Sequence, residues 1–201
     1  SYSLLVHYTD LANGVGGYDI IRGCEISTFA TNIAVNALVT GTFGFIGKSY
    51  EVDAALPAGS TFVAAPANRQ FASFDGRILQ DSATLGFVTS ISQNTDNSAE
   101  ANFEIGSRGP SHISFAKANN TFSIESFFYD YTLFKKFADE EKTAMTAVLS
   151  LDNKALSFSW PEFYYTEGSP DVAGPGDISF NGTGQAVKES GPSSLVIQRV
   201  E

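Results

Sequence analysis

Short segments in which every second residue is apolar recur along this chain, and they constrain its fold more than any other feature. The clearest segment is AEANFEIG, residues 99–106. Such alternation predicts a strand with one face in the core and the other in solvent. The predicted strands are residues 33–40 and 41–47 (as one bent strand or two), 86–92, 99–106, 121–129, 144–151, 155–160, 176–187 and 194–200.

Polar, turn-forming residues separate several of these segments. The sequence QNTDNS, residues 93–98, predicts a hairpin turn between the strands 86–92 and 99–106. Residues 152–154, DNK, predict a second turn of this kind. Consecutive strands are therefore expected to pair as antiparallel neighbours.

One segment has helical rather than strand spacing. In residues 131–141 the side chains of Leu133 and Phe137 share one helical face, and Asp130 precedes them as a candidate N-cap. One short helix among many strands predicts a mainly β fold, a β-sandwich or split barrel with one short flanking α-helix.

The length of 201 residues fits a single domain over residues 1–201. Within it, residues 48–72 match neither periodicity, and they are too apolar for a solvated linker. We expect this segment to be an arm that packs on another subunit; a loop folded over the domain's own sheet is the alternative. The candidate contact residues of the arm are Tyr50, Val52, Leu56, Phe62 and Val63.

Charge and cysteine content exclude several classes of protein. The net charge of −10 argues against a protein that grips nucleic-acid phosphates, although not against one that nucleic acid moves past. Cys24 is the only cysteine, so neither an intrachain disulfide nor a cysteine-based metal cluster can form. No apolar run approaches the roughly 20 residues that span a bilayer, so we expect no membrane contact.

A search for catalytic and ligand-binding motifs favours structural explanations throughout. His7 and His112 lack ligand spacing, and Cys24 has the setting of a small buried apolar residue. Residues 14–17 lack the full spacing of a dinucleotide loop, and residues 171–177 lack the alternating oxygen ligands of a calcium loop. The sequence therefore predicts no catalytic residue, metal or cofactor, and a protein that is not an enzyme.

The order of the motifs, rather than any one of them, carries a family resemblance. NIAVNALVTGTFGFIGKS is followed by FDGRI, by GFVTSISQNTDNSAEANFEIGSR, by FSIESFFYDYTLFKKF, by FSWPEF, by DVAGPGDISFNGTGQA and by LVIQR. This succession resembles the tail tube proteins of long-tailed bacteriophages. It extends from about residue 20 to residue 200.

The resemblance implies a structural subunit of a virion tail that forms homohexameric rings. The rings stack helically into a hollow tube through which DNA and the tape-measure protein pass, with other tail proteins at its ends. Assembly is expected in the host cytoplasm, and DNA ejection is the function served. The chain begins at Ser1 without an evident leader, so we expect some N-terminal residues to be missing or processed.

Passage of DNA favours an acidic or neutral lumen, because DNA carries one charge per about 1.7 Å of its axis and cationic rings would hold it. The candidate lumen-facing residues lie on the polar faces of alternating strands; the alternative is that they face the outer solvent. They are Glu100, Asn102, Glu104 and Glu125.

Two other functions compete with the tail tube. The first is another virion structural protein, such as a tail terminator, which has no need to stack on both faces. The second is a carbohydrate-binding β-sandwich, which would present an exposed platform formed by Trp160, Tyr164 and Tyr165.

Overall fold

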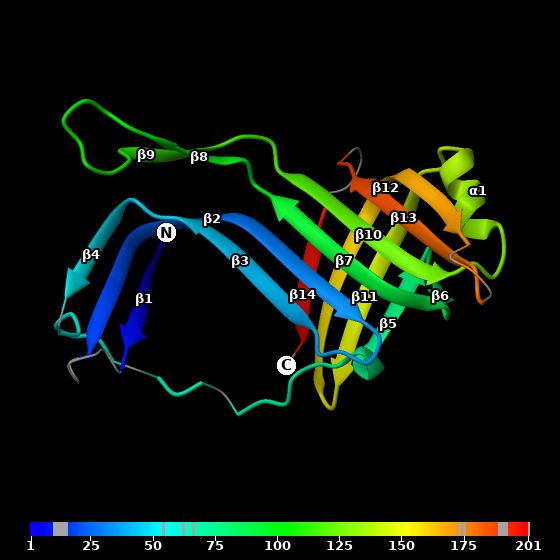
Figure 1. Cartoon of the computed structure of the whole chain (residues 1–201), viewed down its shortest axis with the longest axis horizontal. Coiled ribbons are helices and arrows are strands. Elements are labelled where there is room, and N and C mark those ends of the chain that lie inside the picture. Colours follow the sequence, from blue (N-terminus) through cyan, green and yellow to red (C-terminus); the bar gives the residue numbers. More distant parts are fainter. Residues whose placement is uncertain are drawn as a thin grey trace. The chain divides into compact units, whose positions relative to one another are not determined.

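A computed structural model describes residues 1–9, 16–53, 55–61, 63–65, 67–172, 174, 176–188 and 193–200. Most of this part is strand, and Figure 1 shows its one α-helix, α1 (Thr132–Ala138). A 3₁₀ helix, η1, covers Ser73–Asp75. The strands are β1 (Tyr2–Tyr8), β2 (Gly17–Ala34), β3 (Thr40–Ile46), β4 (Ser49–Asp53), β5 (Gly76–Gln80), β6 (Ala83–Leu85), β7 (Val88–Asp96), β8 (Ala99–Asn102), β9 (His112–Phe115), β10 (Asn119–Phe127), β11 (Thr143–Leu151), β12 (Lys154–Asp171), β13 (Ser179–Ala186) and β14 (Val196–Val200).

The chain divides into two compact units. Unit 1 consists of Ser1–Thr28, Phe43–Asn68 and Asp96–Ala118, and unit 2 of Phe29–Thr42, Arg69–Thr95 and Asn119–Glu201. The strands β2 and β3 each contribute residues to both units. A single domain over residues 1–201 stays a prediction.

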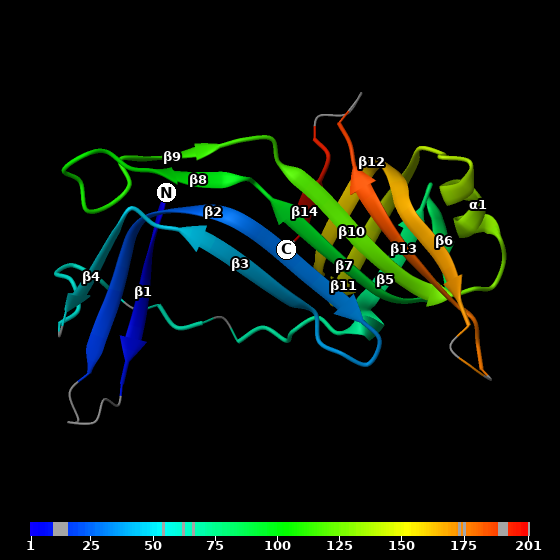
Figure 2. The same cartoon turned by 45° about the horizontal axis from the view of Figure 1, so that its top comes forward.

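Unit 2 is built on a long antiparallel sheet with the strand order β7-β10-β13-β12-β11-β5-β6. The long strand β12 joins its two halves: residues from Lys154 pair with β11, and residues from Phe163 pair with β13. The β11 register shifts between the partners Trp160 and Phe163, around Pro161, which has no backbone N–H to donate. Both pairings lie in one continuous sheet, in which Figure 2 shows β12 with its neighbours β11 and β13. This arrangement confirms the predicted mainly β fold with one short helix.

The core of unit 2 is packed around Phe122 of β10. Its ring centroid lies 5.2 Å from that of Trp160 and 4.6 Å from that of Phe163, the latter edge-on. Phe122, Trp160 and Phe163 are all buried. A Cβ atom at Gly184 of the neighbouring strand would lie 2.3 Å from Phe122 Cζ, so this position has room for glycine alone. Edge-on rings of this kind add to the stabilisation from buried area.

The helix α1 forms where the sequence predicts one, although it ends at Ala138. The Thr132 N–H donates to Asp130 Oδ1 at 2.8 Å, so Asp130 satisfies a backbone donor at the start of the helix. Hydrogen bonds from the Thr132 side chain and from the Thr132 N–H together lower the pKa of Asp130. Leu133 is buried in the core, and Lys136 pairs with Asp81 of the β5–β6 turn. Packing and this ion pair therefore hold a helix that is too short to persist alone.

The predicted strand 33–40 is wrong, because β2 ends at Ala34 and β3 begins at Thr40. Asn36 has φ = 56°, a left-handed conformation that asparagine tolerates in turns. Alternation would place Val35 on the same face as Ile33, but Val35 is 55% exposed whereas Ile33 is buried. A turn inside the alternating pattern therefore breaks the predicted strand.

The predicted hairpin turn at residues 93–98 is also wrong, because β7 continues to Asp96 and lies between β2 and β10. Gln93 is buried there, with Thr31 Oγ1 donating to its Oε1 at 3.2 Å. A polar side chain with a partner of this kind can occupy a strand interior. Residues 99–106 are strand only as far as Asn102, and β8 pairs with β9.

Unit 1 consists of thin sheets with little interior. In it β1 and β4 both pair with β2, and β8 pairs with β9 as a separate hairpin. Among its described residues, the only buried apolar side chains are Ile20 and Cys24. Unit 1 therefore lacks a core comparable with that of unit 2.

Candidate functional site: a polar sheet face without cations

The strands β7, β10 and β13 of unit 2 present one apolar and one polar face. In β10 the side chains of Phe122 and Ile124 point into the core, whereas Ser123 and Glu125 are exposed. The same alternation places Ser92 of β7 on the polar side. Gly182 faces the core beside the Phe180 and Tyr165 rings, so Asn181 and Thr183 face outward. The residue period of a strand therefore aligns three polar rows on one surface.

Two adjoining grooves of about 310 Å³ and 270 Å³ hollow this surface, and they share Ser92 and Ser123. We call their combined lining the polar face. Apart from the core-facing Phe122, Ile124 and Gly182, it consists of Ala30, Thr31, Asn32, Thr40, Thr42, Ser90, Ser92, Gln93, Asn94, Thr121, Ser123, Glu125, Glu167, Ser169, Asn181 and Thr183.

The polar face contains two carboxylates and, among these residues, no lysine or arginine. Glu125 accepts a hydrogen bond from Ser90 Oγ at 3.3 Å. The lining residues include no cation with which Glu125 could form an ion pair. The cations of unit 2 lie on other segments: Arg69, Arg77, Lys135, Lys136, Lys142, Lys154, Lys188 and Arg199. Such a surface can hydrogen-bond through hydroxyls and amides, but it offers a phosphate group no cationic partner.

The candidate lumen residues fall into both units. Glu125 lies on the polar face of unit 2. The other three belong to the β8–β9 hairpin of unit 1, where Glu100 and Glu104 are exposed. Asn102 is half-buried, and its Nδ2 donates to Ser114 Oγ at 2.9 Å across the hairpin. That these four residues face a lumen stays a prediction.

The candidate arm is more ordered at its start than its sequence indicates. Tyr50 and Val52 lie on β4 and are 61% and 68% exposed. Leu56 is half-buried beside Leu5 and Ile20 of its own unit.

Further along the candidate arm, Val63 is 90% exposed. Phe62 lies outside the described residues. The segment therefore combines a residue that packs on its own unit with an exposed one, and its contact with another subunit stays a prediction.

Asp19 of β2 interacts with two tyrosines of unit 1. Tyr8 Oη donates to Asp19 Oδ2 at 3.1 Å. The hydrogen bonds and the negative charge of Asp19 raise the pKa of both Tyr8 and Tyr50. The exposed Tyr50 ring is thereby positioned by its own unit, whereas the outward side chains of Val52 and Val63 have only apolar surface to offer.

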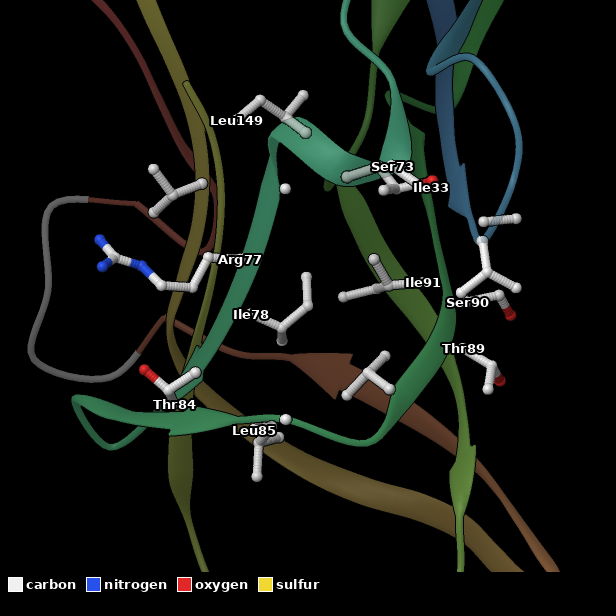
Figure 3. A pocket seen from close by; sticks show the side chains of 16 residues that line it. Ile33, Ser73, Arg77, Ile78, Thr84, Leu85, Thr89, Ser90, Ile91 and Leu149 are labelled. Atoms are coloured by element: carbon white, nitrogen blue, oxygen red, sulfur yellow. The ribbon is translucent and has the colours of Figure 1, made fainter. Parts of the chain in front are cut away.

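A separate cleft of about 240 Å³ lies in unit 2 where β5 and β6 approach β7 without pairing. Figure 3 shows Ile78 and Ile91 facing each other across it. Leu85 and Thr84 lie at one end of the cleft, and Ser73 lies at the other. Its lining contains no histidine, cysteine or carboxylate, so these residues offer neither a nucleophile–base pair nor a metal ligand set.

The structure separates the residues that carry potential chemistry. His7 stacks on Tyr18 at a centroid distance of 4.4 Å, His112 lies on β9, and Cys24 is buried. Among the described residues, no three His, Cys, Asp or Glu side chains are grouped to hold a metal ion. In the part of the chain that the structure describes, no helix has the length and apolar character needed to cross a membrane.

The aromatic platform required by a carbohydrate-binding module is contradicted. Trp160 and Tyr165 are only 1% and 4% exposed and belong to the core of unit 2. Desolvation by burial raises the pKa of Tyr165, whose hydroxyl accepts a hydrogen bond from Gln80 Nε2 at 3.4 Å. These rings stabilise the fold and cannot stack on a sugar.

The breadth of the polar face went unpredicted, although the sequence contains a signal for it. Serine, threonine or asparagine occupies every second position in Ser90–Asn94 and again at 181 and 183. Only the sheet order, which places β10 between β7 and β13, shows that these rows adjoin. Strand pairing between distant segments is what sequence alternation alone cannot provide.

Comparisons with known proteins now identify the family. No curated protein matches this sequence. The sequence model of a family described as "Phage tail tube protein" matches residues 1–188. This match covers most of the chain, and the family is a structural one found in virion tails. The chain therefore belongs to the phage tail tube protein family, and it is a structural component of a phage tail.

Proposed function

We propose that this protein is the repeating subunit of a hollow tail tube whose lumen is lined by the polar face. Six copies form each ring, rings stack into the tube, and DNA and the tape-measure protein pass through it. Assembly takes place in the host cytoplasm, and the role is structural rather than catalytic. The absence of lysine and arginine from the lining residues of the polar face carries this proposal.

The electrostatics of DNA supply the physical reason. Each lysine or arginine that neutralises a phosphate releases a counterion and adds binding free energy. A ring repeats each residue on every subunit, so one cation per chain would become a ring of cations. Hydroxyls, amides and the carboxylates of Glu125 and Glu167 avoid this adhesion. The polar face is therefore suited to DNA that must slide past it without binding.

Unit 1 supports the assembly part of the proposal. Its apolar side chains remain exposed in the isolated subunit, among them Phe43 (52%), Phe103 (66%) and Phe115 (52%). Exposed apolar surface of this extent marks sites of protein–protein contact. Contacts with neighbouring copies would bury it.

A charge substitution on the polar face tests the lumen. In Ser123→Lys/Glu125→Lys both side chains are exposed, so we expect the subunit to fold and the tube to form. DNA release from virions carrying this variant, followed by dye fluorescence, should slow by roughly tenfold or more because cation rings bind phosphates. The slowing should shrink as the salt concentration rises.

The matched control is Ala138→Lys/Asp139→Lys at the exposed end of α1. It changes the net charge by the same amount, and release from it should keep the wild-type rate. Equal rates for the two variants would contradict a lumen lined by the polar face.

A further inference from the structure

We infer that the tip of the β8–β9 hairpin of one copy docks on an aromatic patch at one end of unit 2 of the next copy. This inference rests on the proposed function as a tube subunit. The occupant of the patch is thus a second copy of this chain. Two surfaces with exposed apolar side chains, the hairpin tip and a patch with an acidic rim, carry the inference.

The aromatic patch lies where four neighbouring strands of unit 2 begin or end. The Phe127 N–H donates to the Phe87 carbonyl at 3.0 Å, and the Phe128 N–H to the Ile178 carbonyl at 2.7 Å. The rings of Phe87 and Tyr129 stack at 6.1 Å. These contacts join Phe87, Phe127 and Tyr129 directly, and Phe128 links Ile178 and Tyr131 to them. It consists of Phe87, Phe127, Tyr129, Tyr131, Val172 and Ile178.

The side chains of the patch are more exposed than is usual for aromatic and aliphatic residues. Tyr129 is 83% exposed, Tyr131 70% and Val172 67%. Asp130, Asp171 and Asp177 directly adjoin residues of the patch in the chain, and all three are exposed. A large apolar patch with a charged rim is typical of a protein–protein contact.

The hairpin tip has the complementary character. Phe103 is 66% exposed and Ile105 is fully exposed, just beyond the end of β8. Gly106 has φ = 91°, and the Ser107 N–H donates to the Glu104 carbonyl at 3.1 Å, so the tip is a defined turn. Arg108 is the only cation of the tip, and none of the described ion pairs involves it.

Chain connectivity makes the contact head to tail. The hairpin leaves β7 after Asp96 and returns to β10 at Asn119, whereas the patch begins beside the opposite ends of the same strands, at Phe87 and Phe127. A tip that occupies a neighbour's patch leaves its own patch free. Such heterologous contacts generate an open filament when the rotation between successive copies does not close a ring. The Arg108 charge opposite the acidic rim would set the register.

Tube formation by purified protein, viewed by negative-stain microscopy, tests the hairpin tip. The variant Phe103→Ser/Ile105→Ser removes its apolar side chains, and Ile197→Ser/Val200→Ser is the control because both side chains lie on β14 of unit 2 and are 48% and 59% exposed. We expect long tubes from the wild-type protein and the control. The tip variant should yield monomers or single rings, with at least a tenfold loss of tube mass. Tubes of normal length from the tip variant would overturn the inference and leave the proposed function standing.

Cross-linking identifies the patch as the receptor. Ile105→Cys and Tyr129→Cys are purified separately and mixed. A short bifunctional thiol reagent should then give a cross-linked dimer, because the tip thiol of one protein lies beside the patch thiol of the other. Cys24 is buried, and neither protein alone should give this product. Tubes without a cross-link in the mixture would overturn the inference while supporting the proposed function. A wild-type protein that forms no tubes would overturn both.

Discussion

Unit 2 and unit 1 differ in what they bury. Unit 2 buries Trp160, Phe122, Phe163 and Phe180 nearly completely. Unit 1 buries, among its described apolar residues, only Ile20 and Cys24. Both have aromatic residues in abundance, so composition does not separate them. The difference lies in the interior: unit 2 directs several of its rings into a core, whereas among the described residues of unit 1 no aromatic ring is buried.

This contrast indicates a division of labour. Burial of large apolar side chains is the main stabilising contribution to a fold, so unit 2 supplies the stability of the subunit. The exposed side chains of unit 1 contribute little until another copy covers them. We therefore expect the isolated subunit to be stably folded while the apolar side chains of unit 1 remain exposed to solvent.

The largest effect should come from the core of unit 2. Phe122→Ala leaves a cavity beneath Trp160 and should lower the free energy of unfolding by about 3–5 kcal/mol. Urea denaturation followed by the fluorescence of Trp160, the only tryptophan, measures it. The control Phe103→Ala, at the exposed hairpin tip, should change that free energy by less than about 0.5 kcal/mol. Equal losses would break the contrast between the units.

A smaller effect is expected at the Asp81 network of unit 2. Burial raises the pKa of Asp81. Hydrogen bonds from Lys136, Thr143 and the Ala144 N–H lower the pKa by a larger amount, so the net shift is downward. Thr143 Oγ1 donates to Asp81 Oδ2 at 2.7 Å. The Asp81 side chain is 46% exposed, so solvent screening limits the loss in Asp81→Asn to about 1 kcal/mol.

The pH dependence of this loss has a defined sign. The folded pKa of Asp81 is below that of an unfolded aspartate, about 3.9, so the stabilisation is complete above that pH and disappears as the pH falls through the folded value. Unfolding free energies of the wild type and Asp81→Asn should differ most at neutral pH and converge in acid. A gap that widens in acid would rule out this role for the carboxylate.

The smallest effect on stability is expected in the candidate arm. Val52→Ser/Val63→Ser changes two side chains that are 68% and 90% exposed, so the free energy of unfolding should shift by less than about 0.5 kcal/mol. Tube length, measured by microscopy, should nevertheless fall. Leu56→Ser is the control with the opposite profile, because Leu56 is half-buried in its own unit and its loss should lower stability. Unchanged tubes from the double variant would remove the arm from the assembly surface.

Sequence alternation predicted the strands that have one buried face. β10 and β11 follow the pattern residue by residue, because every second side chain enters the core. The same reasoning missed β1, since a strand of unit 1 has no core to impose a period. It also ended β12 too early, because Pro161 reads as a strand terminator although it lies at a register shift within the strand.

The candidate site was only partly predictable for the same reason. Glu125 is exposed on its strand, as the alternation of β10 indicates. The neighbouring rows on β7 and β13 depend on pairing between segments such as Phe122 and Gly184, which the sequence does not specify. Alternation did not predict that Phe103 is exposed. Phe103 lies beyond the end of β8, in the loop that turns at Gly106.

A helical reconstruction of the assembled tube by cryo-electron microscopy tests the central claim most directly. We predict a ring of six copies with Ser123, Glu125 and Thr183 facing the lumen, and no lysine or arginine in the lumen wall contributed by unit 2. A reconstruction with the polar face on the outer surface, or with Arg77 or Lys154 lining the lumen, would contradict the account.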